Sequence, residues 1–148
     1  MLVIVYLLKG DKMENKTINI AAVTDDGLSI SQHFGRAAFY EVLFVENGKV
    51  VKRERREKLG HNNFAQEEHN HHSGEQHGLD EHSHSKHVSM ADAINDCQIL
   101  LARGMGNGAY QSMLQLNIKP IVTDIRNIDE AVKSVINGTI ADHTEKLH

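Results

Sequence analysis

The sequence predicts a single α/β domain built on a mixed sheet of about five strands, with helices covering its faces. The front half holds one apolar run and a strand pair joined by Asn47-Gly48, the strongest short signal for an antiparallel hairpin. The back half alternates apolar strands with helical patterns, which implies parallel strands joined by right-handed crossovers. With 148 residues, 40% of them hydrophobic and 24% charged, the chain is long enough to bury a core.

The first half is expected to contribute three strands. Residues 18–24 (INIAAVT) form a short apolar run, and the turn residues Asp25-Asp26-Gly27 end it. Residues 39–46 and 49–56 are strand-like runs on either side of Asn47-Gly48. Both residues of such a two-residue turn need positive φ angles, which Asn and Gly tolerate. A buried strand followed by a hairpin is therefore predicted.

The second half is expected to alternate helices with strands. A helix over 90–97, capped by Ser89, comes first, and a continuous apolar strand follows over 98–102 (QILLA). The next helix is expected over 109–116, with Met113, Leu114 and Leu116 facing inward, and the next strand over 118–123 (IKPIVT). A last helix is capped by Asn127 or Asp129 and ends at Gly138. Pro120 removes one backbone donor, which favours an edge position for the strand that contains it.

Charge and cysteine content restrict the class of protein. A net charge of −4 argues against a general binder of nucleic acid or anionic membranes. The single cysteine, Cys97, excludes an internal disulfide and fits a reducing cytoplasm. Residues 1–17 are interpreted as an N-terminal tail, because the apolar MLVIVYLL is too short to span a bilayer and lacks the flanks of a signal peptide. An added edge strand is the alternative for this segment. Residues 18–148 then form the domain.

A histidine-rich stretch interrupts that domain. Residues 61–87 hold eight of the eleven histidines and few apolar side chains, so the stretch is expected to be a disordered loop insertion. Its densest groups are His69, His71 and His72, and then His82, His84 and His87, with carboxylates between them. Imidazole with carboxylate suits Zn, Ni, Cu or Fe, although no four ligands share the spacing of a structural zinc site. A solvated insertion without a dedicated ligand is the alternative.

A glycine-rich turn follows the strand at 98–102. Gly104, Gly106, Asn107 and Gly108 lead into a helix, and Asp124 lies twenty residues beyond Gly104, a pattern that matches the dinucleotide fingerprint. The short remaining chain argues against a nucleotide fold. An anion-accepting turn at a helix N-terminus survives this objection, and a purely structural tight turn is the alternative.

The third candidate is the loop after the first strand. His33 stands beside Gly35 and Arg36 in Ser31-Gln32-His33-Phe34-Gly35-Arg36-Ala37. This placement could present an imidazole to a ligand, with the guanidinium as an anion partner; an incidental loop histidine is the alternative. Cys97 is a possible thiolate ligand, although an inert buried cysteine is the favoured interpretation.

Taken together, four blocks of the chain resemble the dinitrogenase iron–molybdenum cofactor-binding family. They are INIAAVTDDG, SQHFGRAAFYEVLFVENGKVV, CQILLARGMGNGAYQSMLQLNIKPIVTD and IDEAVKSVINGTI, and they cover about residues 18–141. The resemblance implies a ribonuclease-H-like α/β motif without nuclease activity. It also implies a large anionic metal–sulfur cluster as ligand, with His33 as the best ligand candidate, Cys97 as the second, and Arg36 near the Gly106–Ala109 amides as a cradle. The insertion at 61–87 departs from the family pattern.

These observations lead to one expected function and two alternatives. The first is a cytoplasmic, non-catalytic carrier or accessory protein that binds the iron–molybdenum cofactor or another iron–sulfur cluster, in cofactor biosynthesis or insertion for nitrogen fixation. Proteins that donate and accept the cluster would be its partners. The first alternative is a chaperone or store for divalent metal on the histidine-rich loop. The second is a nucleotide-binding enzyme that uses the Gly104–Gly108 turn.

Overall fold

A computed structural model of the chain describes residues 17–58 and 81–148. The strands are β1 (Thr17–Thr24), β2 (Phe39–Glu46), β3 (Lys49–Glu57), β4 (Ile99–Ala102) and β5 (Lys119–Val122); the helices are α3 (Glu81–Asp92), α4 (Asn107–Gln115) and α5 (Ile128–Asn137), with a 3₁₀ turn η1 (Thr144–Lys146). Residues 1–16 of the expected N-terminal tail or added edge strand lie outside this description, and Thr17 is the first residue of β1. No helix in the two described ranges is long and apolar enough to cross a membrane.

The five strands form one mixed sheet in the order β3-β2-β1-β4-β5. β1 pairs antiparallel with β2 and parallel with β4; β2 pairs antiparallel with β3, and β4 parallel with β5. The predicted mixed five-stranded α/β architecture is therefore confirmed. Pro120 lies in the edge strand β5, as its missing donor predicts.

The hairpin between β2 and β3 has the turn that its sequence predicts. Asn47 and Gly48 have φ angles of 54° and 79°, and Glu46 pairs with Lys49 across the turn. Positive φ at both positions gives a turn whose twist matches that of the strands. The hairpin therefore fixes the register of β2 on β3 locally.

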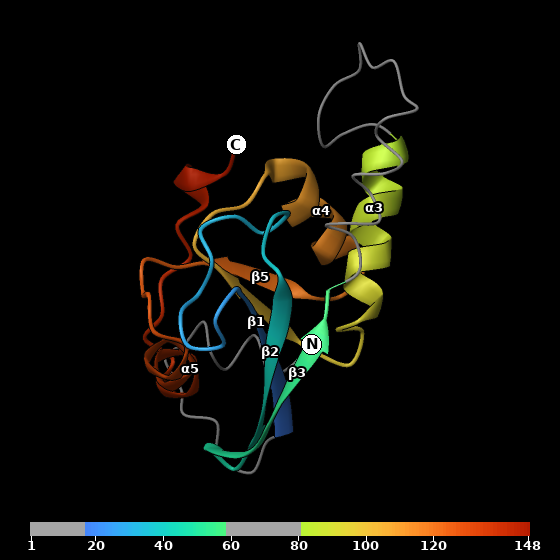
Figure 1. The fold of residues 1–148 in the computed structure, drawn as a ribbon. Helices are drawn as coiled ribbons and strands as arrows, with labels where there is room; N and C mark the ends of the chain where they lie inside the picture. Colours follow the sequence, from blue (N-terminus) through green and yellow to red (C-terminus); the bar gives the residue numbers. More distant parts are fainter. Residues whose placement is uncertain (1–16, 59–80) are drawn as a thin grey trace.

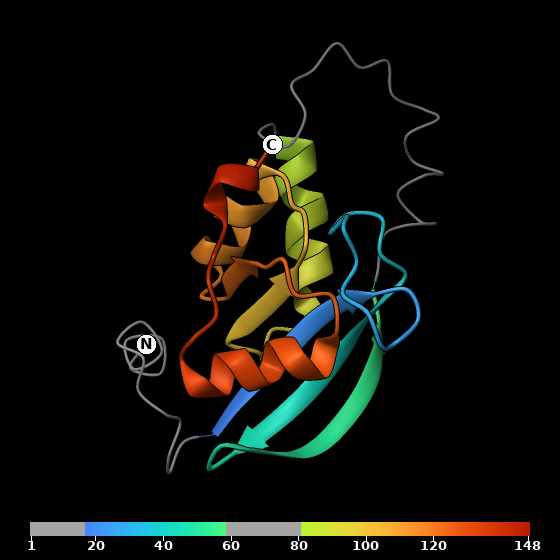
Figure 2. The same ribbon diagram turned by 90° about the vertical axis from the view of Figure 1, so that its left-hand side faces the viewer.

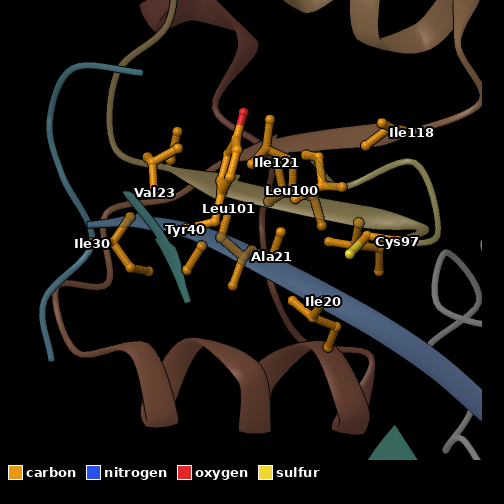
Figure 3. Close-up of a cluster of buried hydrophobic side chains, with 14 of the residues drawn as sticks. Ile20, Ala21, Val23, Ile30, Tyr40, Cys97, Leu100, Leu101, Ile118 and Ile121 are labelled. Carbon is orange, nitrogen blue, oxygen red and sulfur yellow. The ribbon is translucent and has the colours of Figure 1, made fainter. Parts of the chain in front are cut away.

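Helices cover both faces of the sheet. Figure 1 shows α5 on one side of the strands and α3 with α4 on the other, and Figure 2 shows α5 crossing in front of them. The central strand β1 is buried on both faces, so Ile18, Ile20 and Val23 are all inaccessible to solvent. Figure 3 shows how its side chains pack with those of β4 and with Tyr40. The core thus lies along β1 and β4.

Two expectations about helices were wrong in detail. The helix expected over 90–97 spans Glu81–Asp92, so residues 81–87, expected to belong to a disordered loop, are helical, and Ser89, expected to cap the helix, lies inside it. No Gly or Pro occurs between these bounds, and Met90 and Ala91 provide buried contacts near the helix end. Leu114 and Leu116, expected to face inward, are 40% and 38% exposed: the buried side of α4 includes Ala109, Ser112 and Met113 but not Leu114, and Leu116 lies beyond the last helical residue, Gln115.

The last helix confirms its predicted boundary signals. The Asn127 side chain accepts a hydrogen bond from the Glu130 N–H (2.9 Å), and Gly138 ends the helix in the left-handed conformation with φ of 71°. A side-chain oxygen at the N-cap and a glycine beyond the last turn satisfy backbone groups that a helix leaves unpaired. Of the two predicted caps, Asn127 rather than Asp129 is used.

Candidate functional site

Two of the predicted site segments meet at one edge of the sheet. Residues 25–38 follow β1, residues 103–106 follow β4, and the parallel pairing of these strands places both connections at the same end. The Arg103 N–H donates to the Ser31 carbonyl oxygen (3.0 Å), and the Phe34 N–H donates to the Gly104 carbonyl oxygen (3.1 Å). The structure therefore brings the loop of His33 and the turn of Gly104 into direct backbone contact.

Gly104 is the glycine that this contact requires. A Cβ on residue 104 would lie 2.1 Å from the Gln32 carbonyl oxygen, far inside van der Waals contact. A Cβ on Gly35 would meet nothing within 4 Å, and one on Gly106 would stand at an ordinary 3.5 Å from the backbone oxygen of His148. Of these three, only Gly104 permits a close approach of two backbones.

The loop that carries His33 is ordered by its own short-range hydrogen bonds. Ser31 Oγ accepts from the His33 N–H (3.1 Å), and the His33 carbonyl accepts from the amides of Arg36 (3.2 Å) and Ala37 (3.1 Å). Phe34 is buried in the core and anchors the loop, while the side chains of His33 and Arg36 are exposed. The loop therefore presents an imidazole and a guanidinium to solvent.

The start of the same loop confirms the turn chemistry expected of its two aspartates. Asp26 Oδ1 accepts from the amides of Leu28 and Ser29, both at 2.8 Å. Asp25 Oδ1 accepts from the Ala38 N–H (2.8 Å) and so closes the loop at its far end. Backbone hydrogen bonds lower the pKa of the Asp26 carboxyl below its ordinary value of 3.8, because they favour the charged form.

Sequence reasoning missed Lys58, which lies under the loop at the end of β3. Lys58 is only 3% exposed; its Nζ lies 3.4 Å from the Gly35 carbonyl oxygen and 4.9 Å from the centroid of the Phe34 ring. Burial lowers its pKa from 10.5 to about 8, and the charge of Asp25 offsets part of this effect. In the sequence Lys58 ends the charged run KRERREK, so nothing there distinguishes it from a solvated lysine.

Arg103 is the second residue that sequence reasoning missed. It follows β4 directly and precedes Gly104, and its backbone N–H joins the turn to the loop. Its Nε atom is buried and has no hydrogen-bond partner among residues 17–58 and 81–148. A buried donor without an acceptor costs free energy, so this group would gain from an anionic ligand beside the turn.

The N-terminal turn of α4 is covered by the chain itself. The Asn107 N–H donates to the backbone oxygen of His148 (2.7 Å), and the His148 N–H donates to the Met105 carbonyl (3.3 Å). Gly108 is buried inside the first turn of the helix. The helix start expected to form an amide cradle at Gly106–Ala109 is therefore present, but its Asn107 N–H is already hydrogen-bonded to His148.

Cys97 lies far from the other candidates. β4 runs from Ile99 to Ala102, so Cys97 precedes the strand and Gly104 follows it, at opposite ends. Figure 3 shows Cys97 near Ile20 and Ile118, away from Val23 at the other end of β1. The thiol is buried, and burial raises its pKa to about 12. The structure does not bring Cys97 to His33, and the burial of the thiol agrees with the favoured interpretation of an inert cysteine.

The histidine-rich candidates are only partly covered by the structure. His69, His71 and His72 lie outside the described residues, and His82 and His84 lie on α3, where their side chains are not described. His87 Nδ1 lies 3.3 Å from Ser112 Oγ of α4. Across the part of the chain that the structure describes, no three His, Cys, Asp or Glu side chains converge as a metal ion would require.

Asp124, the acidic residue of the suggested dinucleotide fingerprint, has other partners. Its carboxylate contacts His143 Nε2 at 3.2 Å and is paired with the Lys146 ammonium. The ammonium of Lys146 is the main reason that the pKa of Asp124 lies below its ordinary value. Because Asp124 is already paired with His143 and Lys146, its position gives no support to a ribose contact, and the geometry does not favour a nucleotide site.

Comparisons with known proteins identify one family and one fold. The family model described as dinitrogenase iron–molybdenum cofactor matches residues 16–138. No curated protein sequence matches the chain. Among solved structures, the apo form of the orange protein from Desulfovibrio gigas has a TM-score of 0.57 at 20% identity, covering 90% of this chain and 96% of that chain.

Two further solved structures are similar. A candidate dinitrogenase from Methanocaldococcus jannaschii has a TM-score of 0.58 at 11% identity, covering 87% of this chain and 97% of that chain. A candidate NifB protein from Thermotoga has a TM-score of 0.52 at 15% identity, covering 86% and 94%. At such identities the likeness shows the fold alone.

Proposed function

This chain belongs to the dinitrogenase iron–molybdenum cofactor family, and from that premise we propose that it is a non-catalytic accessory protein that carries a preformed anionic metal–sulfur cluster as cargo. The cargo would be the iron–molybdenum cofactor or another iron–sulfur-type cluster, received from a donor protein and passed to an acceptor during cofactor biosynthesis or insertion. The orange protein and the NifB-like structure share the fold of this chain.

The observation that carries the proposal is the contact between the His33 loop and the Gly104 turn. It brings the loop that carries the exposed side chains of His33 and Arg36 against the turn after Arg103, whose buried Nε has no hydrogen-bond partner within residues 17–58 and 81–148. Cationic donors of this kind favour an anion, and guanidinium groups suit a large and weakly hydrated one. The donor set therefore fits an anionic cluster held by charge and by one imidazole ligand.

The position of Cys97 favours carrying a cluster over assembling one. Iron–sulfur clusters are usually held by several Cys thiolates. This chain has one cysteine, which is buried at the opposite end of β4 from Gly104. The cluster would therefore keep most of its own ligands and arrive already built. His33 would ligate or hydrogen-bond one exposed atom of it, and the arginines would neutralise its charge.

Anaerobic loading tests the proposal. The full chain is mixed with ferrous iron, sulfide and a small thiol that builds clusters in solution, with and without molybdate, and then desalted. We expect charge-transfer absorption and a Mössbauer signal to co-elute with the wild-type protein. His33→Ala should retain several-fold less cluster, and Cys97→Ala should retain as much as the wild type. Loss of retention in Cys97→Ala alone, equal retention by wild type and His33→Ala, or no retention at all would overturn the proposal.

A divalent-metal store is the second candidate, and the eight histidines within residues 61–87 favour it. The test should leave α3 intact, because residues 81–87 are helical and His87 contacts Ser112 of α4. Replacing His61, His69, His71, His72 and His77 with Asn leaves the residues of α3 unchanged. If Ni, Zn and Cu binding disappears while cluster retention persists, the histidine-rich segment binds metal and the His33 site binds cluster. If both disappear, the segment is the functional centre.

A further inference from the structure

We propose that residues 139–148 form a strap that competes with the cargo for the first turn of α4, and that loading the protein displaces the strap. This inference rests on the proposed function, because it concerns the regulation of the same site. The family match ends at residue 138, so the strap lies outside the part of the chain that the family model describes. Figures 1 and 2 show the strap running from α5 to the start of α4.

The base of the strap is fixed to the edge of the sheet. The His143 N–H donates to the Val122 carbonyl (2.8 Å), and the Val122 N–H donates to Asp142 Oδ1 (2.9 Å). Asp142 Oδ2 also accepts from the Tyr110 hydroxyl (2.7 Å) and from the Lys119 ammonium (3.0 Å). These partly buried, charge-assisted contacts hold residues 142–143 in place on β5 and α4.

The distal half of the strap is held much less firmly. Thr144, Glu145 and Lys146 are exposed and form only a three-residue 3₁₀ turn, η1. Lys146 is paired with Asp124, which is itself exposed, and such surface ion pairs contribute little to stability. Leu147, which is only partly buried against the core, is the one apolar contact of this half. Release of the distal half therefore exposes one leucine and leaves the contacts of residues 142–143 in place.

The released end is the part that occupies the proposed site. The backbone oxygen of His148 lies 2.7 Å from the Asn107 nitrogen, where an anion bound at the start of α4 would place its own acceptor atom. Met105 and Asn107 bond to the strap, while Arg103 and Gly104, two residues earlier, bond to the His33 loop. Cargo that reaches from His33 to the helix N-terminus must therefore replace the His148 contact.

Lys146→Gln separates this mechanism from a simple charge effect. Removing a positive charge near an anion site should weaken anion binding, whereas releasing the strap should strengthen it. We expect Lys146→Gln to retain cluster about two- to tenfold more tightly than the wild type, the range that loss of one exposed ion pair allows. Lys133→Gln removes an equal charge from an exposed position of α5 and should bind no more tightly than the wild type.

A second readout does not depend on the cluster. The Asn107 amide donates to His148, so its hydrogen exchange, followed by NMR, should be faster in Lys146→Gln than in the wild type and in Lys133→Gln. Unchanged exchange, or cluster binding that is no tighter in Lys146→Gln, overturns the strap. If no variant retains a cluster, the proposed function fails. Titration with inorganic phosphate then decides: a larger shift of the Asn107 resonance in Lys146→Gln supports the strap, and an equal shift overturns it.

Discussion

Gly104 lies so close to Gln32 that a Cβ at residue 104 would sit 2.1 Å from the Gln32 carbonyl oxygen. The neighbouring hydrogen bonds, Arg103 N–H to Ser31 and Phe34 N–H to Gly104, fix this approach on both sides. Two segments that are about seventy residues apart in the sequence are therefore in direct backbone contact. The geometry of the site depends on this contact.

Gly104→Ala should therefore damage both the fold and the site. The clash is with backbone rather than with a flexible side chain, so the loop or the turn must move. We expect a loss of about 1–3 kcal/mol or more in the free energy of unfolding, measured by urea denaturation. Cluster retention should fall along with it, because His33 and Arg103 separate.

Gly35→Ala is the matched control for that variant. Gly35 belongs to the same site, yet a Cβ there meets nothing within 4 Å. Its unfolding free energy should stay within about 0.5 kcal/mol of the wild type. If the two alanine variants are equally stable, the close approach of Gly104 to Gln32 is not a feature of the folded protein.

The buried ammonium of Lys58 predicts an unusual dependence of stability on pH. Its pKa is about 8 in the folded chain, against 10.5 ordinarily. Between these values the unfolded state binds more protons, so stability rises with pH across that window. Below pH 8 the buried charge costs on the order of 3 kcal/mol, a net cost in which the charge of Asp25 already offsets part of the desolvation.

Lys58→Met tests this directly. The apolar substitution should raise the free energy of unfolding by about 1–3 kcal/mol at pH 7, and the advantage should shrink as pH rises from 8 to 10.5. Urea denaturation at several pH values measures both effects. A constant difference between wild type and variant across that range would show that Lys58 is not held in a desolvated position.

The ion pair between Arg56 and Asp96 ties the edge strand β3 to the turn before β4. Its two contacts measure 2.6 and 2.9 Å, and Arg56 is the main reason that the pKa of Asp96 lies below 3.8. Because the folded pKa is the lower one, the stabilisation is present above pH 3.8 and is lost as pH falls further. Asp96 is 44% exposed, so the contribution is small.

Asp96→Asn should accordingly cost about 0.5–1 kcal/mol at pH 7. The difference from the wild type should vanish as the pH drops through and below 3.8, which denaturation at pH 7, 5 and 3 would record. Asp92→Asn, a charge-matched change at an exposed position of α3, should change the free energy of unfolding at pH 7 by no more than about 0.5 kcal/mol. A deficit in Asp96→Asn that persists at pH 3 would point to packing rather than to the ion pair.

Cys97 should be chemically inert in the folded protein. Burial raises the pKa of its thiol to about 12, and the thiolate is the reactive form. We expect a thiol-specific disulfide reagent to modify native protein at least about a hundredfold more slowly than urea-unfolded protein. Similar rates in the two states would mean that Cys97 is accessible, and its exclusion from cluster binding would then have to be reconsidered.

The sequence predicted those parts of the fold that depend on φ angles and hydrogen bonds within a few residues. Asn47-Gly48 specified the hairpin, Asn127 and Gly138 bounded α5, and Pro120 indicated an edge strand. Each of these residues acts through its own φ angle or hydrogen bonds. Leu114 was misplaced because the side of a helix that is buried depends on its neighbours in the fold, and Leu116 because the helical periodicity was continued past Gln115, where α4 ends.

The candidate site could be predicted only in pieces. His33 and the glycine turn were recognisable as motifs, but their contact depends on the parallel pairing of β1 with β4. Lys58 and Arg103 could not be recognised in the sequence, because they differ from the other basic residues only in their burial, and no local pattern predicts that burial. Cys97 was a plausible ligand until the direction of β4 placed it at the other end of the sheet.

The pairing of β1 with β4 also determines when the site forms. Asn19 and Gln98, which meet there, are 79 residues apart, whereas β2 and β3 are joined by a two-residue turn. Closing so long a segment costs entropy before any contact repays it, so we expect the hairpin to fold early and β4 to dock late. The His33 loop meets Gly104 only after that docking. A cargo bound there recognises the completed fold alone and shifts the folding equilibrium toward it by mass action.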